Sequence, residues 1–265
     1  MLQICELFIY PIKSLGGIAV QQAYLTDRGF KYDRRWLLVD RNNVFLTQRD
    51  IPKMALLQTA LGETGLSVFQ KHDASQSLHI PFDAINRETI SVTIWDDTCI
   101  AQLISPDIDA WFTAALGTDC RLVYMPEHSR REVDPKYATQ QELTSFSDGY
   151  PTVIIGQASL DDLNARLQIP VAMNRFRPNI VFTGGTAFAE DDMAAFSIND
   201  IDFFGVKLCS RCMITTINQE NAETGKDPLR TLSQYRMQNN KVQFGQNLLH
   251  KGEGWISAGD KIILH

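Results

Sequence analysis

The chain has 265 residues, of which 44% are hydrophobic and 21% are charged, with 16 Gly and 10 Pro along its length. This balance excludes disordered, collagen-like and coiled-coil proteins, and it predicts a globular chain that buries its own core as one large domain or two lobes. The 25 Lys and Arg against 31 Asp and Glu give a net charge of −6. That charge lacks the basic excess of proteins that bind nucleic acids or membrane surfaces, so we expect a small-molecule partner.

No segment has the 18 or more apolar residues of a membrane span, and no basic stretch precedes an apolar one at the amino terminus. The five cysteines are an odd number and lie too far apart for a disulfide framework in a chain of this length. These features predict an untargeted protein in a reducing, cytoplasmic setting.

The amino-terminal half is expected to consist mainly of short strands. Residues 2–10 are rich in Ile, Leu, Phe and Tyr and stop at Pro11, which is typical of a strand that enters a loop, here residues 11–17. Four further apolar runs of strand length follow, and the first two flank a polar turn and are predicted to pair as a hairpin. These runs are residues 36–39, 44–47, 91–95 and 99–103.

The clearest helix signal covers residues 105–117. Ser105 can cap the free amides, Pro106 suits the first helical position, and Gly117 can end the helix. Two further helices are expected over residues 159–167, with Ser159 as the cap, and 228–236.

Strands dominate the expectation for the carboxy-terminal half as well. Many short strands with few helices favour a mainly β protein with attached helices, an α+β chain with a barrel-like architecture, over alternating βαβ units. A lobe boundary is expected near Gly117, which divides the chain into residues 1–118 and 119–265. The later strands are expected over residues 152–155, 180–183, 201–208, 213–217, 242–249 and 261–264.

Cys209 and Cys212 form the sharpest local motif, a C-x-x-C pair. A structural zinc ion needs four ligands, and since no second Cys pair or His pair accompanies this one, zinc would require a scattered site. A thioredoxin-like dithiol belongs at a helix start, whereas residues 213–217 are strand-like. In a third interpretation, one thiolate, favoured by the adjacent Arg211, is a soft ligand for a transition metal that a cofactor holds. In a fourth, both cysteines are small apolar residues at a strand end.

Cationic side chains recur close to the ends of expected strands. Lys13 and Ser14 precede two glycines, whose backbone can approach a ligand such as a phosphate, although a solvated turn is the simpler alternative. Arg34 and Arg35 precede the strand that begins at residue 36, and they can bind a phosphate or form a surface ion pair with Asp33.

Three more polar groups are candidates. Arg177 and Asn179 lie just before the strand at residues 180–183, and the Asn179 amide can recognise the donors and acceptors of a heterocycle. Asp148 lies in a turn by composition and can be a proton donor or, as composition alone favours, a turn-capping carboxylate. The three acids at residues 190–192 are expected to form a solvated loop.

In their order along the chain, these clusters resemble the MOSC family, in the branch of the mitochondrial amidoxime-reducing component and its bacterial relatives. The resemblance spans residues 2–264 and implies a MOSC β-barrel joined to an N-terminal β-rich lobe, with a molybdenum ion held by the dithiolene of a pterin cofactor. The motifs that carry it are YPIKS at residues 10–14, DRRW at 33–36, NRFRPNIV at 174–181, CSRC at 209–212 with TT at 215–216, and FGQN at 244–247.

The resemblance also implies a role for each candidate residue. Cys212 would be the catalytic thiolate ligand of molybdenum, with Asp148 near the metal, and Cys209 would support the loop. The residues that would hold or surround the molybdenum cofactor are Lys13, Ser14, Arg34, Arg177 and Asn179.

The implied reaction is the reduction of N-hydroxylated compounds, such as amidoximes and hydroxylamines. Its electrons would come from a separate ferredoxin-, flavin- or haem-type protein, because the chain has no Cys run with the spacing of an iron–sulfur cluster. Some bacterial relatives carry a fused ferredoxin domain and the mitochondrial members carry an anchor; since the sequence shows neither, we expect no membrane partner. The alternatives are a sulfur carrier that uses a Cys212 persulfide and a protein that only stores or delivers the cofactor.

Overall fold

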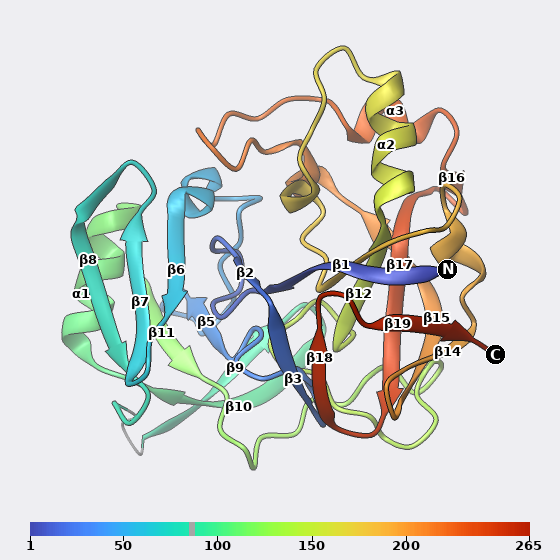
Figure 1. Ribbon diagram of the computed structural model, residues 1–265. Coiled ribbons are helices and arrows are strands. Elements are labelled where there is room, and N and C mark those ends of the chain that lie inside the picture. Colours follow the sequence, from blue (N-terminus) through green and yellow to red (C-terminus); the bar gives the residue numbers. More distant parts are fainter. Residues whose placement is uncertain (85–87) are drawn as a thin grey trace.

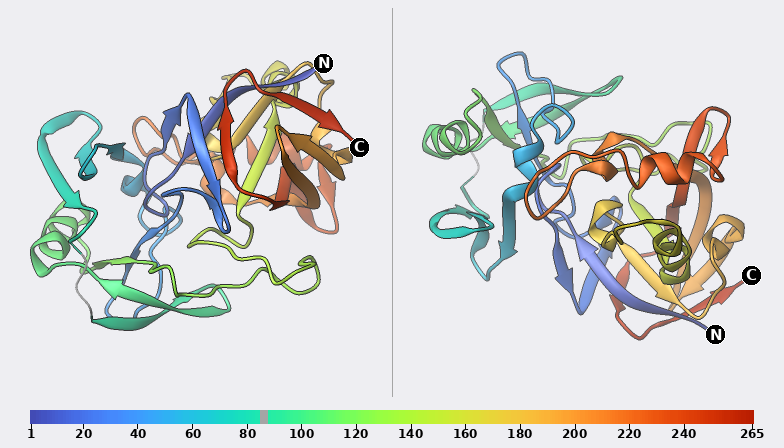
Figure 2. Two further views of the ribbon diagram at one scale, coloured as in Figure 1. Left: turned by 60° about the horizontal axis from the view of Figure 1, so that its bottom comes forward. Right: turned by 90° about the horizontal axis from the view of Figure 1, so that it is seen from above.

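The computed structural model describes residues 1–84 and 88–265, which form two lobes (Figure 1). Both chain termini lie on the larger lobe. The smaller lobe, drawn mainly in light blue to green, lies beside it in the further views as well (Figure 2).

The larger lobe contains a barrel of seven strands, in which the last strand pairs back onto the first. Neighbouring strands of the barrel are antiparallel, except that the first two strands in the order given below are parallel to each other. The predicted mainly β fold with a barrel is therefore confirmed. In barrel order the strands are β12 (Thr152–Gly156), β13 (Ile180–Thr183), β1 (Leu2–Ile9), β19 (Lys261–Leu264), β14 (Ala195–Ile198), β15 (Ile201–Arg211) and β17 (Lys241–Lys251).

Apolar side chains from both ends of the chain share one core in this lobe. Ile4 and Leu7 of β1 are buried in the same cluster as Phe196, Phe203 and Leu248. Short strands extend this lobe: β2 (Ile18–Val20) pairs with β1, β16 (Met237–Gln238) pairs with β17, and β18 (Gly254–Ser257), β3 (Gln22–Thr26) and β4 (Gly29–Phe30) form a three-stranded sheet.

The described residues of the smaller lobe form two sheets and one α-helix. One sheet has the order β5 (Trp36–Val39), β11 (Arg121–Tyr124), β10 (Asp97–Leu103) and β9 (Thr89–Ile94), and the other consists of β6 (Leu57–Leu61), β7 (Gly65–Gln70) and β8 (Asp73–Pro81). Each lobe thus contains strands from both sides of residue 118. The boundary expected there stays a prediction.

The helix of the smaller lobe, α1 (Pro106–Leu116), begins and ends as predicted. The Ser105 hydroxyl accepts a hydrogen bond from the backbone N–H of Asp107 at 3.3 Å, and Gly117 closes the helix with φ 64°. Ile108 and Phe112 pack into the core of this lobe. The start and end of α1 that the sequence predicts therefore agree with the way this helix packs into the lobe.

The cap predicted for the second helix is wrong. Helix α2 (Gln157–Arg166) begins after Gly156, and Ser159 lies inside it, where its hydroxyl donates to the buried Glu190 carboxylate at 2.8 Å. The acids at residues 190–192 are not a solvated loop either, because they belong to the 3-10 helix η3 (Ala189–Asp192), and Asp191 forms an ion pair with Arg236 at 2.5 Å. The third helix, α3 (Leu229–Ser233), is shorter than expected.

Two predicted strands are absent from the described residues. The segment at residues 44–47 makes single bridges, Val39 to Phe45 and Val44 to Thr93, so the hairpin is only partly formed after its polar turn. Residues 213–217 form the 3-10 helix η4 (Met213–Thr216) instead of a strand. Two further 3-10 helices are η1 (Pro52–Leu56) and η2 (Met173–Arg175).

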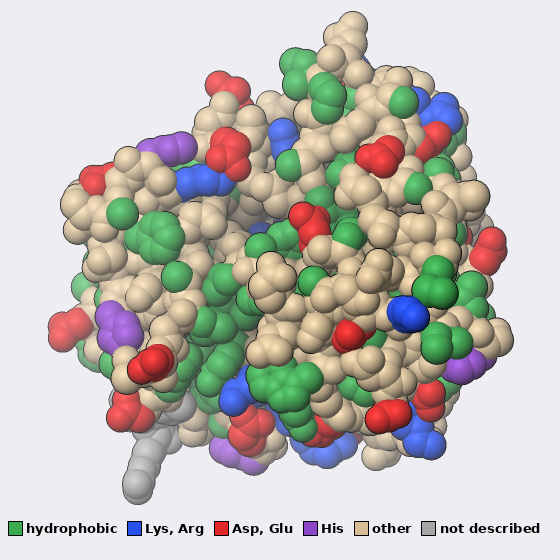
Figure 3. All heavy atoms as spheres, in the orientation of Figure 1, with side chains coloured by type: hydrophobic (Ala, Val, Ile, Leu, Met, Phe, Trp, Pro, Cys, Tyr) green, Lys and Arg blue, Asp and Glu red, His purple; other side chains and the backbone are tan. Residues whose placement is uncertain are grey.

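One face of the molecule carries charged side chains of both signs. On the face shown in Figure 3, acidic and basic side chains of the described residues are interspersed, and no broad basic patch is visible. Among the described residues, none of the helices has the length and apolar character needed to cross a membrane.

Candidate active site

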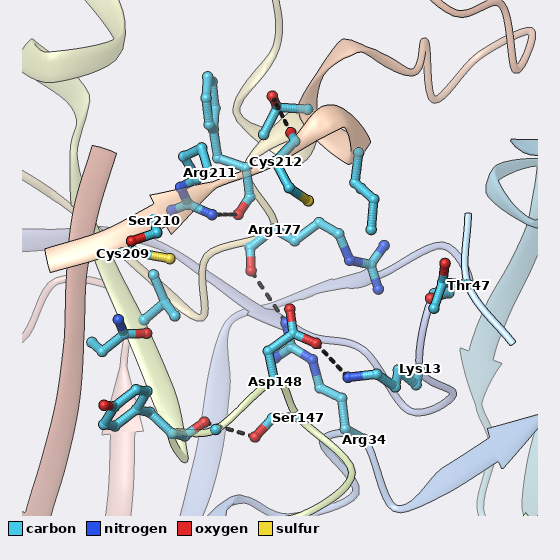
Figure 4. A pocket seen from close by; sticks show the side chains of 18 of the residues that line it. Lys13, Arg34, Thr47, Ser147, Asp148, Arg177, Cys209, Ser210, Arg211 and Cys212 are labelled. Atoms are coloured by element: carbon cyan, nitrogen blue, oxygen red, sulfur yellow. Dashed lines mark hydrogen bonds and ion pairs between the residues drawn. The ribbon is translucent and has the colours of Figure 1, made fainter. Parts of the chain in front are cut away.

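One pocket collects all seven side chains that the sequence singles out for cofactor or catalytic roles. Lys13, Ser14, Arg34, Asp148, Arg177, Asn179 and Cys212 all line it. Figure 4 shows the Cys212 side chain above Arg177 and the Lys13 and Asp148 side chains below it, with Cys209 to the left. The structure thus brings together residues that lie up to 199 positions apart, although their roles stay predictions.

Left-handed backbone conformations place three of these residues. Ser14 has φ 68°, Arg34 has φ 48° and Arg177 has φ 52°. Non-glycine residues rarely adopt positive φ, and such strained positions concentrate at functional sites, where the surrounding structure holds them.

The buried ring of Tyr10 orients the two arginines. The guanidinium carbons of Arg34 and Arg177 each lie 4.3 Å from the centre of this ring. Arg34 also donates to the buried Asp33 carboxylate at 2.6 Å, so this ion pair exists but is not on the surface. Arg177 donates to the Leu15 carbonyl at 2.7 Å. Burial lowers the pKa of Arg177 to about 10, which leaves it charged at neutral pH.

Asn179 lines the pocket and forms hydrogen bonds with three other segments of the chain. Its amide oxygen accepts from Arg34 at 3.1 Å and from the Val153 N–H at 3.3 Å, and its amide nitrogen donates to the Phe8 carbonyl at 3.2 Å. Because these bonds already engage both ends of the amide, Asn179 positions Arg34 in this structure. Recognition of a heterocycle would require some of these bonds to open.

Lys13 and Asp148, which both line the pocket, form an ion pair at 2.6 Å. Burial lowers the pKa of Lys13 to about 8, although the Asp148 carboxylate opposes this shift. Partial desolvation would raise the pKa of Asp148, but the charge of Lys13 and its hydrogen bond outweigh that effect and hold the pKa well below its usual range. Asp148 is therefore ionised and is not ready to donate a proton.

The glycines that follow Lys13 serve a different purpose from the one expected. A side chain at Gly16 would overlap the Gln58 side chain, and one at Gly17 would overlap the Tyr10 ring. Close packing of the protein itself therefore explains both glycines. Arg35 likewise lies outside the pocket lining and reaches the Met125 carbonyl at 2.6 Å.

Cys212 lies where strand β15 gives way to η4. The β-branched Thr residues that follow Cys212 predict a strand, but their hydroxyls bond the backbone of a turn instead. The Thr215 hydroxyl donates to the Cys212 carbonyl at 3.0 Å, and the Thr216 hydroxyl donates to the Met213 carbonyl at 2.7 Å. Threonine hydroxyls that bond the backbone locally compete with strand pairing. The resulting turn places Cys212 at the pocket lining.

The cation beside the Cys212 sulfur is Arg49, which sequence reasoning missed. Its guanidinium Nη2 lies 3.3 Å from Sγ. Arg211, the expected neighbour, instead donates to the carbonyls of Phe244 and Phe176, each at 2.7 Å. The only sequence signal for Arg49 is its place in a polar segment directly after an apolar run.

The donor set limits which metal the pocket can hold. Among the described residues, no group of three or more His, Cys, Asp or Glu side chains could hold a metal ion by itself. Burial raises the pKa of the Cys209 thiol, which favours its neutral form. One terminal nitrogen of Arg211, Nη2, is buried without a hydrogen-bond partner. Cations, free donors and a sulfur fit an anionic cofactor that brings its own metal ligands.

Comparison with known proteins shows the family of this chain. The model of the MOSC N-terminal beta barrel domain matches residues 1–119, and that of the MOSC domain matches residues 141–263. The chain is 30% identical to mitochondrial amidoxime-reducing component 1 of Mus musculus, over 98% of this chain and 82% of the relative. The chain belongs to the MOSC family. The predicted resemblance is therefore confirmed.

Two further relatives differ in the function that their names state. It is also 30% identical to mitochondrial amidoxime-reducing component 1 of Homo sapiens, over 98% of this chain and 82% of the relative. It is 27% identical to the molybdenum cofactor sulfurase of Oryza sativa subsp. japonica, over 97% of this chain but only 35% of that protein. The MOSC protein is thus related to enzymes whose names concern amidoxime reduction or molybdenum cofactor.

Proposed function

We propose that this MOSC protein binds molybdenum cofactor in the pocket and reduces N-hydroxylated compounds, such as amidoximes and hydroxylamines, with electrons from a separate ferredoxin-, flavin- or haem-type protein. The observation that carries the proposal is the convergence of Lys13, Arg34, Arg177 and Cys212 on one pocket. Relatives named for amidoxime reduction support the reaction class.

The residues present fit an anionic cofactor. Lys13, Arg34 and Arg177 supply positive charge in a largely buried setting, where charge-assisted hydrogen bonds to a phosphate are strong. The Ser14 hydroxyl adds a neutral donor, and Cys212 supplies the one sulfur that the metal would need from the protein. When bound, the cofactor would supply a metal centre that exchanges two electrons and takes up an oxygen atom.

Residues of the chain itself would contact the substrate and the metal-bound sulfur during the reaction. An amidoxime takes up two electrons and two protons, its N–O bond breaks, and an amidine and one water molecule result. Asp148 is ionised, so it can accept a hydrogen bond from the N–H or O–H of the substrate, but it holds no proton to give. Arg49 lies next to the Cys212 sulfur and stabilises negative charge there.

The test is the Cys212→Ser variant, purified after expression with an intact pterin pathway. We expect it to lose reduction of benzamidoxime under a chemical electron donor, because the hydroxyl is a poor substitute for a soft thiolate ligand. Cys5→Ser, at an exposed cysteine on β1, should keep full activity. Full activity of Cys212→Ser would remove this residue from the mechanism.

A sulfur carrier is the second candidate function. It is favoured by two observations: both cysteines of the pair line the pocket, and one relative is a molybdenum cofactor sulfurase. A cofactor-loaded wild type that leaves benzamidoxime unchanged but takes labelled sulfur onto Cys212 from a persulfide donor would establish the carrier in place of the reductase. Cofactor binding with neither activity would indicate a storage or delivery protein.

A further inference from the structure

A tryptophan occupies the tip of a hairpin where its backbone is strained. Ile94 of β9 pairs with Asp97 of β10, so Trp95 and Asp96 form a two-residue connection. Trp95 has φ 56°, at a hairpin position where glycine is favoured because it accepts positive φ. A bulky side chain in this conformation is an outlier that local turn chemistry does not explain. Core packing does not explain it either, since Trp95 is 45% exposed.

Contacts hold the Trp95 ring beside the mouth of the pocket. The Arg49 guanidinium carbon lies 4.4 Å from the ring centre, and the Phe45 ring packs edge-on at 5.0 Å. The indole N–H lies 3.4 Å from the Asp148 carboxylate oxygen that also accepts from Lys13. Arg49 and Asp148 both line the pocket, so the Trp95 ring, which contacts both, lies next to the pocket lining.

Arg49 connects this ring to the sulfur. The same guanidinium that lies over Trp95 donates to the Cys212 Sγ. The path from the Cys212 sulfur through Arg49 thus leads to the Trp95 ring. Arg49 is a positioning residue in this arrangement, since it acts through the sulfur and the ring.

We infer that Trp95 determines substrate specificity by giving the entrance an aromatic wall that favours N-hydroxylated compounds with an aromatic ring next to the reacting group. The inference rests on the proposed function and names the substrate class of the same site. Aromatic rings gain a specific, geometry-dependent attraction from packing against one another, whereas a short aliphatic group gains little from an exposed indole.

The variant that tests this inference is Trp95→Gly. Glycine adopts positive φ without a steric cost, so the hairpin keeps its backbone while the ring is lost. With the cofactor-loaded enzyme we expect KM for benzamidoxime to rise about tenfold, in line with the strength of aromatic pairs. KM for the aliphatic acetamidoxime should not change.

Two further variants separate the ring from other causes. Trp95→Phe keeps an aromatic wall but lacks the indole N–H, so it should keep most of the preference for benzamidoxime. Trp255→Phe alters another exposed tryptophan, which lies on β18 and packs against Tyr24, and it should leave both KM values unchanged.

A binding measurement on the cofactor-free protein needs no turnover. Benzamidoxime should quench tryptophan fluorescence in the wild type and in Trp255→Phe, and the quenching should be lost in Trp95→Phe. An unchanged KM for benzamidoxime in Trp95→Gly, or an equal rise for both substrates, would overturn the inference. A wild type that binds benzamidoxime through Trp95 but reduces neither compound would contradict the proposed function while supporting the aromatic wall.

Discussion

Buried cations dominate the site at the scale of single residues. Lys13 is 6% exposed and Arg177 is half-buried, and both would be costly to bury without an anion to pair with. Asp148 neutralises only one of them. The remaining positive charge is what an anionic cofactor would stabilise, and it makes the pocket sensitive to the protonation of Lys13.

This sensitivity predicts a pH dependence of anion binding. Because the pKa of Lys13 is lowered to about 8, the ammonium is present below that pH and is lost as the pH rises through it. Sulfate keeps its charge over this range, so its affinity for the cofactor-free protein should fall between pH 7 and 9.5, by up to about tenfold per pH unit above the pKa. Calorimetric titration at constant ionic strength would measure the affinity.

The control for this prediction is Lys13→Gln, which cannot titrate. It should bind sulfate more weakly at pH 7 and with little change up to pH 9.5, since Arg177 stays charged below about pH 10. A wild-type affinity that is the same at pH 7 and 9.5 would show that Lys13 does not face the bound anion.

Sequence reasoning found the site residues that follow recurrent motifs, and it missed those set by tertiary contact. Lys13, Arg34 and Cys212 were predictable because short motifs and their order along the chain carry them. Arg49 meets the Cys212 sulfur through a contact between residues 163 positions apart, and no local pattern records that contact. The same holds for Glu190, whose burial against Ser159 depends on how η3 meets α2.

At the scale of elements, local signals succeed where the backbone decides the outcome. Helix α1 has a serine cap, a proline at its first position and a glycine in the left-handed conformation at its end, all within residues 105–117. The segment after Cys212 shows the opposite case. Its β-branched residues favour a strand, but the Thr215 and Thr216 hydroxyls satisfy backbone carbonyls within a 3-10 turn.

The two ends of α1 make a testable contribution to stability. Ser105→Ala should lower the free energy of unfolding by about 1 kcal/mol, because it removes the acceptor for the Asp107 N–H. Gly117→Ala should cost about 1 kcal/mol as well, because alanine is strained at φ 64°. Urea titration followed by circular dichroism would measure both changes.

A substitution in the middle of the same helix is the control for the two caps. Ala114 is exposed, and Ala114→Gln should change the free energy of unfolding by no more than about 0.5 kcal/mol. If the cap variants are no less stable than Ala114→Gln, the ends of α1 do not limit the stability of the smaller lobe.

At the scale of the whole molecule, the chain crosses between its lobes more than once. Strand β1 lies between β13 and β19 in the barrel, although 170 residues separate it from the start of β13 along the chain. Strand β11 follows residue 118 yet pairs with β5 in the smaller lobe. The fold class was predictable from strand content and family resemblance, but such long-range pairing leaves no local pattern in the sequence.

These crossings predict that residues 119–265 do not fold as an independent unit. Removing β1 leaves the edges of β13 and β19 unpaired and exposes apolar side chains such as Phe196 and Leu248, which creates a template for aggregation. We expect this fragment to aggregate or to melt without cooperativity in calorimetry. Co-expression with residues 1–118 should restore a soluble complex with one cooperative transition, since that segment returns both β1 and the Lys13 wall of the pocket. A cooperative transition in the isolated fragment would instead establish residue 118 as a boundary between folding units, and the pocket would then form when two preformed domains dock.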